Sequence, residues 1–344
     1  MHGVLPSHIL LDMTTTLRTD QPTLTRTAQQ MTCRGRGLLA ADESITTMSA
    51  RLEAEGIPAS EVTRRDYREL LLTAGGLAES VSGIILSDET FGQELSDGRT
   101  FPVAAHELGI LSGIKVDTGT APLPGQGGAL VTEGLDGLGA RLASYAERGA
   151  AFAKWRAVFD VTTAHEYAAR ANAHALARYA ALCQEHGIVP IVEPEVLCGG
   201  THSLAASAET SRLALGSVFE ELDRAGVDLA GIVLKPNFVT PGLNAPAVPV
   251  ADVARATYDV LVDTVPAAVP GIAFLSGGHP TPDVCAFLAT LRTVSERPWE
   301  VTFSFGRALV SDALRTWAGD PANVGAAQQR LLGNCREAAA ATTR

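Results

Sequence analysis

The sequence predicts an α/β fold of the (β/α)8 TIM-barrel class, in a single domain. Eight apolar runs of strand length recur along the 344 residues, helix-like segments separate them, and no Pro- or Ser-rich linker divides the chain. Apolar strands alternating with helices are typical of a parallel sheet covered by helices, and eight such units close into a barrel. The runs are Gly37–Asp42, Val81–Asp88, Leu111–Asp117, Ala150–Arg156, Ile188–Glu195, Leu229–Pro236, Gly271–Gly278 and Val301–Arg307.

The segments between these runs carry the signals expected of helices and loops. Ala175–Gly187 and Ser211–Gly226 have apolar residues at i, i+3, i+4 spacing, and each ends on a glycine. The glycine-rich stretch "PGQGGAL", Pro124–Leu130, lacks the Lys-Ser/Thr of a phosphate-binding loop, so we expect an ordinary βα loop there. Residues 1–20 read as a loosely ordered N-terminal extension, and residues 21–344 as the barrel.

The composition excludes several classes of function. Hydrophobic residues make up 46% and charged residues 19%, with a net charge of -11, which favours a globular core and argues against nucleic acid as a partner. No apolar run approaches the ~20 residues of a membrane span, and the N-terminus lacks the basic stretch of a secretion signal. The five cysteines form no CxxC, as expected of a reduced cytoplasmic protein.

Charged and polar residues recur where the predicted strands end. In TIM barrels the carboxyl ends of the strands meet at the mouth that holds the active site. We therefore expect this set to converge on one pocket. Its members are Asp42, Lys115, Asp117, Lys154, Arg156, Glu193, Glu195, Lys235, Ser276, Ser304 and Arg307.

Lys235 raises a specific question, because it follows the buried run "GIVL" and precedes Pro236. Alone, it could be a lysine that reaches solvent from a strand end. A partly desolvated lysine near other cations, such as Lys154, loses its proton more easily and can form a Schiff base with a ketone. A carboxylate such as Glu193 could move protons during that step.

Two glycine-containing loops predict a phosphate site. "SGG", Ser276–Gly278, and "FGR", Phe305–Arg307, follow the seventh and eighth runs, the usual place for phosphate in such barrels. Glycines let backbone N–H groups approach an anion, and Arg307 adds a fork of donors. The histidines lack metal-ligand spacing such as HxxxH, so we expect no metal.

Nine stretches together resemble the class I (Schiff-base) fructose-bisphosphate aldolases. The resemblance runs from about Cys33 to about Leu331. It implies reversible cleavage of fructose 1,6-bisphosphate into dihydroxyacetone phosphate and glyceraldehyde 3-phosphate, with no metal or other cofactor. The stretches are "GLLAADES", "GIKVDTG", "GLDGL", "FAKWR", "ANAHALARYA", "GIVPIVEPE", "LKPNFVTPG", "FLSGG" and "TFSFGRAL".

The resemblance implies a role for each matched residue at the reaction centre. Lys235 of "LKPN" would form the imine with the C2 ketone, and Lys154 of "AKWR" would tune the site and help expel the C2 hydroxyl. Glu193, the first glutamate of "EPE", would be the proton shuttle, and Glu195, the second, would hold the lysine pair. Asp42 of "AADES" would take the C4-hydroxyl proton as the C3–C4 bond breaks.

Further matched residues would bind the substrate, but the match is incomplete at the C6 phosphate. The first helix of the family usually carries a lysine and an arginine for that phosphate, whereas here Ala50 stands in the lysine place and Arg51 is kept. Ser44 and Thr47 can still donate hydrogen bonds, so we expect weaker C6-phosphate binding. The residues expected to line the pocket and hold the C1 phosphate are Lys115, Arg156, Ser276, Gly277, Gly306 and Arg307.

Alternatives remain at this stage. The Ala50 difference keeps open a Schiff-base aldolase that acts on another ketose phosphate, such as fructose 1-phosphate. A non-catalytic binding protein on the same barrel would predict damage to Lys235, Glu193 or Asp42, and all three are present. The resemblance also implies a homotetramer. Since the chain ends at Arg344 without the tail and terminal tyrosine of animal members, proton transfer at the enamine carbon is expected to use water or another residue.

Overall fold

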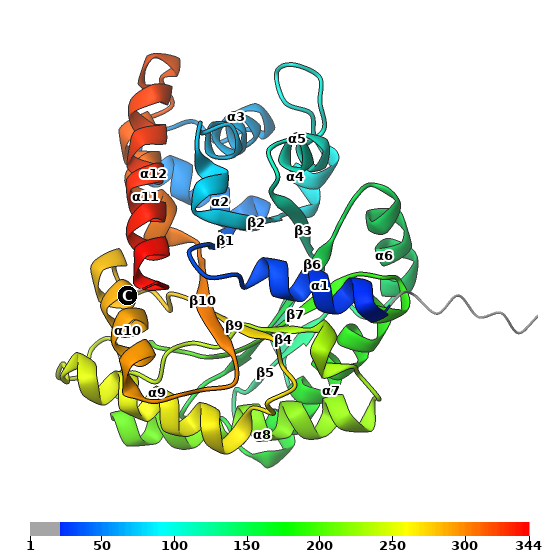
Figure 1. Cartoon of the computed structure of the whole chain (residues 1–344), viewed down its shortest axis with the longest axis vertical. Coiled ribbons are helices and arrows are strands. Elements are labelled where there is room, and N and C mark those ends of the chain that lie inside the picture. Colours follow the sequence, from blue (N-terminus) through cyan, green and yellow to red (C-terminus); the bar gives the residue numbers. More distant parts are fainter. Residues whose placement is uncertain (1–20, 344) are drawn as a thin grey trace, which may run out of the picture.

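Eight parallel strands close into a barrel, and helices surround it (Figure 1). The computed structural model describes residues 21–343, so the N-terminal extension expected at residues 1–20 lies outside the described residues. The strand order around the barrel is β1-β10-β9-β8-β7-β6-β3-β2. Each barrel strand therefore pairs with its neighbours along the chain, and the predicted single-domain (β/α)8 fold is confirmed.

The elements occur in the alternating order that the sequence predicted. The barrel strands are β1 (Gly37–Ala41), β2 (Val81–Leu86), β3 (Leu111–Lys115), β6 (Phe152–Phe159), β7 (Val189–Val196), β8 (Val233–Leu234), β9 (Gly271–Phe274) and β10 (Glu300–Phe305). The helices are α1 (Gln21–Met31), α2 (Ile45–Ala54), α3 (Glu61–Leu72), α4 (Asp88–Gly92), α5 (Phe101–Glu107), α6 (Leu138–Glu147), α7 (Glu166–Glu185), α8 (Leu204–Arg224), α9 (Val250–Thr264), α10 (Thr281–Val294), α11 (Arg307–Trp317) and α12 (Val324–Ala341). Short 3-10 turns cover Leu77–Glu79, Leu229–Gly231 and Pro321–Asn323.

The sixth apolar run contains a much shorter strand than predicted. Leu229–Gly231 forms a 3-10 turn, because the Asp228 carboxylate accepts a hydrogen bond from the Ala230 N–H and caps it. The strand proper is only Val233–Leu234. Pro236, which has no N–H to donate, then prevents the ladder from continuing.

The region after β3 contains a β-hairpin that was not predicted. Strands β4 (Gly119–Pro122) and β5 (Leu130–Glu133) pair antiparallel, outside the barrel sheet. The stretch "PGQGGAL" therefore lies at the tip of a hairpin inserted between β3 and α6, and is not a simple βα loop. Gly125, Gly127 and Gly128 all have positive φ, which a tight reversal requires and which glycine adopts without strain.

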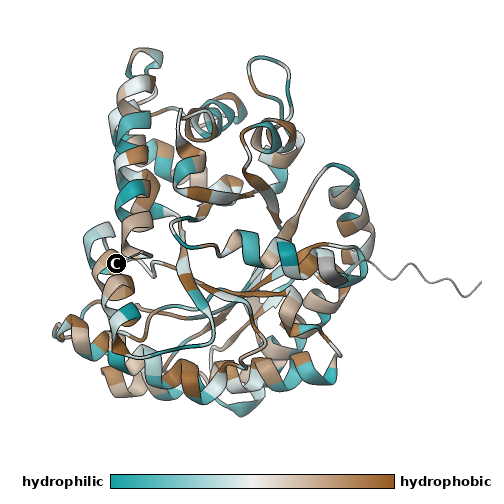
Figure 2. Cartoon of the chain, viewed as in Figure 1, coloured by the Kyte–Doolittle hydropathy of each residue, from teal (hydrophilic) through white to brown (hydrophobic). Residues whose placement is uncertain are grey.

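Two apolar cores lie on the two faces of the barrel sheet. The outer core packs the strands against the helices, and the inner core fills the lower part of the lumen. Hydrophobic residues dominate the strands, whereas hydrophilic residues recur on the helices around them (Figure 2). Helix α1 closes the amino-terminal end of the lumen through buried Leu24, Ala28 and Met31. The lumen is therefore a packed core whose other end is left for the site.

Strand periodicity assigns each side chain to one of these faces. Along β6, Phe152 belongs to the lumen core and Trp155 to the outer core. Gly113 on β3 makes room for Phe152, because a Cβ on this glycine would lie 2.0 Å from the Phe152 ring. The same inward positions, followed toward the carboxyl ends of the strands, reach the charged residues of the mouth.

Candidate active site

Two lysines and two carboxylates form a buried cluster at the mouth of the barrel. Lys154 Nζ lies 2.7 Å from Asp42 Oδ2 and 3.2 Å from Glu193 Oε2. Lys235 Nζ lies 2.8 Å from Glu193 Oε1. The exposed fractions are 4% for each lysine, 3% for Glu193 and 9% for Asp42. Lys235 is therefore held in a pocket by a carboxylate, which excludes the interpretation that it reaches solvent from a strand end.

The sequence pattern explains why these four side chains meet. On β7, Val189 and Ile191 point into the lumen core, so Glu193 points inward above them. The same alternation leads from Phe152 to Lys154 on β6 and from Val233 to Lys235 on β8. Rigid strand ends therefore carry three of the four groups, and Asp42 directly follows β1.

The charged groups of this cluster shift one another's pKa values. Burial alone would raise the pKa of Asp42, but the ammonium groups of Lys154 and Lys235 outweigh it and lower that pKa to about 2. The same balance lowers the pKa of Glu193, where burial is again opposed by the two lysines. Burial would lower the pKa of Lys154, but the carboxylates of Asp42 and Glu193 hold it well above its usual range. Lys154 is therefore a permanent cation between two ionised carboxylates at neutral pH.

One oxygen of Glu193 remains free to exchange a proton. Oε1 accepts from Lys235, whereas Oε2 is buried and makes no hydrogen bond to any residue between 21 and 343. Oε2 is within ion-pair distance of Lys154 but outside hydrogen-bond geometry, so the contact is electrostatic. A buried acceptor without a hydrogen bond is costly unless a ligand uses it.

A second charged group lies beside this cluster. Lys115 Nζ contacts Asp117 Oδ1 at 2.6 Å, and the Arg156 guanidinium forms an ion pair with Glu195. Asp117 also accepts a hydrogen bond of 3.3 Å from the Arg156 backbone N–H. We expected Glu195 to hold the lysine pair. That expectation is wrong in its geometry, because Glu195 contacts Arg156 and it is Glu193 that contacts both lysines.

The loops after β9 and β10 meet on one side of the mouth. Gly277 and Gly278 have φ of +57° and +93°, and a Cβ on Gly278 would lie 3.4 Å from Arg307 Nη2. A Cβ on Gly277 would lie only 2.6 Å from Cys198 Sγ, so this turn requires glycine. Gly306 directly precedes α11, whose first residue is Arg307. The predicted residues of the C1-phosphate site thus combine a glycine turn, a helix amino terminus and a guanidinium.

The residues expected at the C6 phosphate are differently engaged. Ser44 caps α2 by accepting from the Thr47 N–H, and the two hydroxyl oxygens lie 3.0 Å apart on the surface. Arg51 forms an ion pair with Glu43, which also binds the buried Arg68. No motif or spacing in the sequence singles out Glu43, although it directly follows Asp42. Arg51 is therefore already paired with a carboxylate, whereas Ser44 and Thr47 are exposed.

The described part of the chain also bears on metal and membrane sites. Between residues 21 and 343, no group of three or more His, Cys, Asp or Glu side chains could hold a metal ion. Within the same range, no helix combines the length and apolar character needed to cross a membrane.

Comparison with known proteins gives the family. The model of the glycolytic family "Fructose-bisphosphate aldolase class-I" matches residues 23–344. A fructose-bisphosphate aldolase of Dictyostelium discoideum is 44% identical over 315 residues, which cover 90% of this chain and 88% of the relative. A probable class 1 fructose-bisphosphate aldolase of Xylella fastidiosa (strain Temecula1) is 45% identical over 318 residues, 91% of this chain and 95% of the relative. The chain belongs to the class I fructose-bisphosphate aldolase family.

The solved structures agree with this assignment. A fructose-bisphosphate aldolase from Plasmodium falciparum superposes with a TM-score of 0.91 at 39% identity, covering 93% of this chain and 94% of the other. The chain is therefore an enzyme, a lyase of the fructose-bisphosphate aldolase class, and the interpretation as a non-catalytic binding protein is wrong. Class I aldolases work through a Schiff base, and the site described above is where this aldolase has the groups for that chemistry.

Proposed function

We propose that this aldolase cleaves fructose 1,6-bisphosphate reversibly through an imine on Lys235, without a metal ion. The observation that carries the proposal is the buried Glu193 carboxylate, whose two oxygens lie 2.8 Å from Lys235 Nζ and 3.2 Å from Lys154 Nζ. One carboxylate can thereby serve both the nucleophilic lysine and the lysine that remains a cation. The pocket needs no metal to stabilise charge, because Lys154 supplies a fixed positive charge.

Imine formation is assigned to Lys235 and Glu193. Lys235 first passes its ammonium proton to Glu193, and the neutral amine attacks the C2 carbonyl. An amine proton moves to the C2 oxygen, and the resulting hydroxyl leaves as water with the proton that Glu193 returns, which gives the protonated imine. Glu193 Oε2 makes no hydrogen bond in residues 21–343, so it can accept the proton of the amine and return it to the departing hydroxyl. Lys154 stabilises the negative charge that develops on that oxygen.

Carbon–carbon cleavage is assigned to Asp42. Its carboxylate takes the proton of the C4 hydroxyl, the C4 oxygen becomes a carbonyl, and the electrons of the C3–C4 bond move into the protonated imine to give an enamine. The low pKa of Asp42, about 2, keeps this group ionised at neutral pH. Its hydrogen-bonding partner Lys154 keeps it oriented.

The substrate's two phosphates are assigned to two different groups of residues at the mouth. The C1 phosphate would bind Ser276, Gly277, Gly306 and Arg307, where backbone N–H groups and a guanidinium gather. Lys115 and Arg156 would line the pocket between the two ends. The C6 phosphate would bind near Ser44 and Thr47, with Arg51 already paired with Glu43. These local cations offset a net charge of -11, which otherwise repels an anion.

The residues near the expected C6-phosphate site make a second substrate, one without a C6 phosphate, worth measuring. Ala50 replaces a lysine and Arg51 is paired with Glu43, so a ketose with no C6 phosphate loses little there. Fructose 1-phosphate is therefore the competing substrate. The ratio of kcat/KM for the bisphosphate and the monophosphate decides between them, and a ratio near one would favour a broad ketose phosphate aldolase.

Borohydride trapping tests the assignment of Lys235. The protein is incubated with dihydroxyacetone phosphate, reduced, digested and mapped by mass spectrometry, with a sample lacking ligand as the control. We expect one adduct, on Lys235, and full activity in EDTA. An adduct on another lysine, or activity abolished by EDTA, would overturn the proposal.

The cellular setting is part of the same proposal. We expect a cytoplasmic enzyme, since a relative described as a cytosolic isozyme of Arabidopsis thaliana is 44% identical over 316 residues. We also expect a homotetramer that binds neither nucleic acid nor membranes, on the family resemblance and the acidic net charge. Light scattering of the purified protein at micromolar concentration measures the oligomeric state directly.

A further inference from the structure

The segment that carries Lys235 is weakly held on its β7 side, although the Leu275 N–H donates a hydrogen bond of 2.9 Å to the Pro236 carbonyl on the other side. Strand β8 has only two residues, and its pairing with β7 ends with the Lys235 N–H donating to the Val192 carbonyl at 2.8 Å. The next hydrogen bond of a parallel ladder would need an N–H on Pro194, and proline has none. Lys235 and Glu193, which must stay together for the proposed chemistry, thus face each other where the ladder stops.

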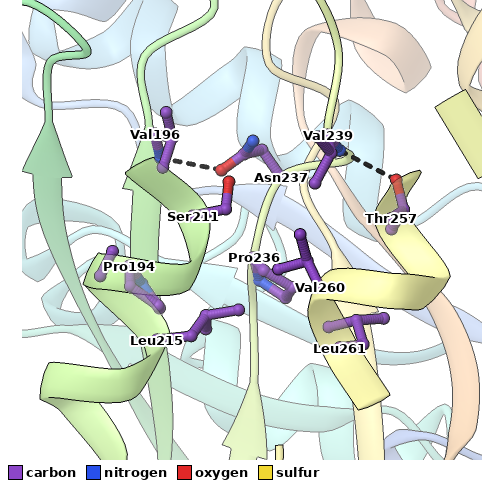
Figure 3. Close-up of a pocket in the computed structure, with 11 residues that line it drawn as sticks. Pro194, Val196, Ser211, Leu215, Pro236, Asn237, Val239, Thr257, Val260 and Leu261 are labelled. Carbon is purple, nitrogen blue, oxygen red and sulfur yellow. Dashed lines mark hydrogen bonds between the residues drawn. The ribbon is translucent and has the colours of Figure 1, made fainter. Parts of the chain in front are cut away.

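The side chain of Asn237 supplies the missing connection. Its Oδ1 accepts a hydrogen bond of 2.8 Å from the Val196 N–H on β7, and its Nδ2 donates to the Phe238 carbonyl at 2.8 Å. Asn237 is 7% exposed, so water competes poorly for these bonds. Figure 3 shows this amide between the end of β7 and the loop after β8.

Packing between the Lys235 segment and the outer helices is incomplete. The position of the segment therefore depends more on the hydrogen bond between Asn237 and Val196. A small, mostly apolar cavity lies between the two strands and helices α8 and α9 (Figure 3). Pro194 and Pro236, the residues that directly follow Glu193 and Lys235, line it. The buried Ser211 hydroxyl, also on its wall, makes no hydrogen bond to any described residue. Because side chains beside a void lose contacts on that side, the two prolines are held less firmly from the back than a filled core would hold them.

Other hydrogen bonds hold the loop on its sides away from β7, among them that from the Leu275 N–H to the Pro236 carbonyl and one to helix α9. Thr257 of α9 accepts a hydrogen bond of 2.9 Å from the Val239 N–H and donates one of 2.7 Å to the Val253 carbonyl. This anchor ties the loop to the outer helix layer. Asn237 ties it to β7, the strand that carries Glu193.

We infer that Asn237 is a positioning residue, whose amide keeps Lys235 opposite Glu193 by joining the two strands beyond the point where Pro194 ends their ladder. The inference rests on the proposed roles of Lys235 and Glu193. It assigns no contact between Asn237 and the substrate. Loss of the amide should let the Lys235 segment move away from β7 and lengthen the 2.8 Å contact between Nζ and Oε1.

The test compares Asn237→Ala with Gln184→Ala. Gln184 holds the start of the segment that leads into β8, through side-chain hydrogen bonds of 2.8 and 2.9 Å to Asp228, at the end far from the mouth. A displacement of about 1 Å at a reacting group can lower a rate about 100-fold. We expect Asn237→Ala to lower kcat and the rate of borohydride trapping at Lys235 by about 10- to 100-fold, with KM within about threefold, whereas Gln184→Ala should stay within about twofold of wild type. Both variants should lose similar amounts of Tm.

Further variants separate the two hydrogen bonds of the amide. Asn237→Asp keeps an acceptor for the Val196 N–H, so its trapping rate should exceed that of Asn237→Ala by about fivefold or more. If Asn237→Ala does not fold, Asn237→Ser takes its place under the same criteria, because its hydroxyl is too short to reach Val196. A kcat within twofold of wild type, or an equal loss in Gln184→Ala, would overturn the inference. If wild type itself forms no adduct on Lys235, the proposed function fails instead.

Discussion

The amino-terminal half of the barrel lumen (the lower lumen) and the mouth at its carboxyl end are lined by inward-facing positions of the same strands. These positions carry apolar residues in the lower lumen and charged residues at the mouth. In the amino-terminal half of the lumen, Phe152 and Val233 help to fill an apolar core closed by α1. Two residues further along the same strands, Lys154 and Lys235 replace them with charges. Apolar packing in the lower lumen fixes the strands in place. The same strands carry the charged groups of the mouth, so those groups are held rigidly as well.

The two halves also differ in how their burial is stabilised. Apolar side chains in the lower lumen gain free energy as they leave water. The charges of the mouth lose hydration when buried, and they are retained only because each has a partner of opposite sign. Asp42, Lys154, Glu193 and Lys235 form a chain of such partners. Substitutions in the lower half should therefore change stability, and substitutions in the mouth should change chemistry.

The largest effect is expected for Lys235→Met. It removes the nucleophile while nearly preserving the volume of the side chain, so activity should fall by at least about 10⁴-fold. Steady-state kinetics with fructose 1,6-bisphosphate measures this. Folding should survive, because Glu193 keeps its contact with Lys154. Activity within about 100-fold of wild type would contradict the role of Lys235.

The matched substitution in the lower lumen is Phe152→Ala. Removing a fully buried phenylalanine should lower the free energy of unfolding by about 3–5 kcal/mol. The cavity would lie beside Gly113, which already leaves room for the ring. Urea unfolding measures the loss, and kcat of the folded protein should stay within about threefold. A large loss of kcat with unchanged stability would contradict the idea that the lower lumen determines stability and the mouth determines chemistry.

Lowering the pH should remove stabilising free energy contributed by the charged groups of the mouth, whereas the apolar side chains of the lower lumen do not titrate. The pKa of Asp42 is about 2 in the folded protein against an ordinary value of 3.8. A carboxylate whose pKa is lowered on folding stabilises the protein above its unfolded pKa, and this contribution disappears as pH falls through the folded pKa. Asp42 should thus contribute about 2 kcal/mol that is lost between about pH 4 and pH 2.

The Asp42→Asn variant is the control for this pH dependence. Its unfolding free energy should run parallel to that of wild type above pH 5, and the two curves should converge as pH falls from 4 to 2. Parallel curves over the whole range would mean that Asp42 has an ordinary pKa.

The smallest effect is expected for Ala50→Lys. A lysine at this exposed position of α2 would add a cation on the helix that carries Thr47, one of the residues proposed for the C6 phosphate. An exposed ion pair is worth about 1 kcal/mol or less, so KM for fructose 1,6-bisphosphate should fall by up to about fivefold. Fructose 1-phosphate, which has no C6 phosphate, is the matched control and should be unaffected. An equal change for both substrates would place the effect elsewhere in the site.

Much of the site could be predicted, but its pairings could not. The position of Lys154, Glu193 and Lys235 at the ends of predicted strands predicted that they meet at one mouth. It could not predict that Glu195 binds Arg156 and leaves the two lysines to Glu193, because partners on neighbouring strands depend on register. Arg51 was likewise expected at the phosphate, and its pairing with Glu43 depends on how α2 packs against the strand ends.

The sequence by itself determined the number and order of the barrel strands, the gathering of charges at the ends of those strands, and, through the resemblance of nine stretches, the family. The strands follow from apolar run length and the spacing of apolar residues, which can be read without contacts. Only the tertiary structure decided which charges pair, how short β8 is, and that Asn237 joins two strands. The physical reason is that these features depend on distances between segments far apart in the chain, such as the 2.8 Å between Asn237 Oδ1 and the Val196 N–H.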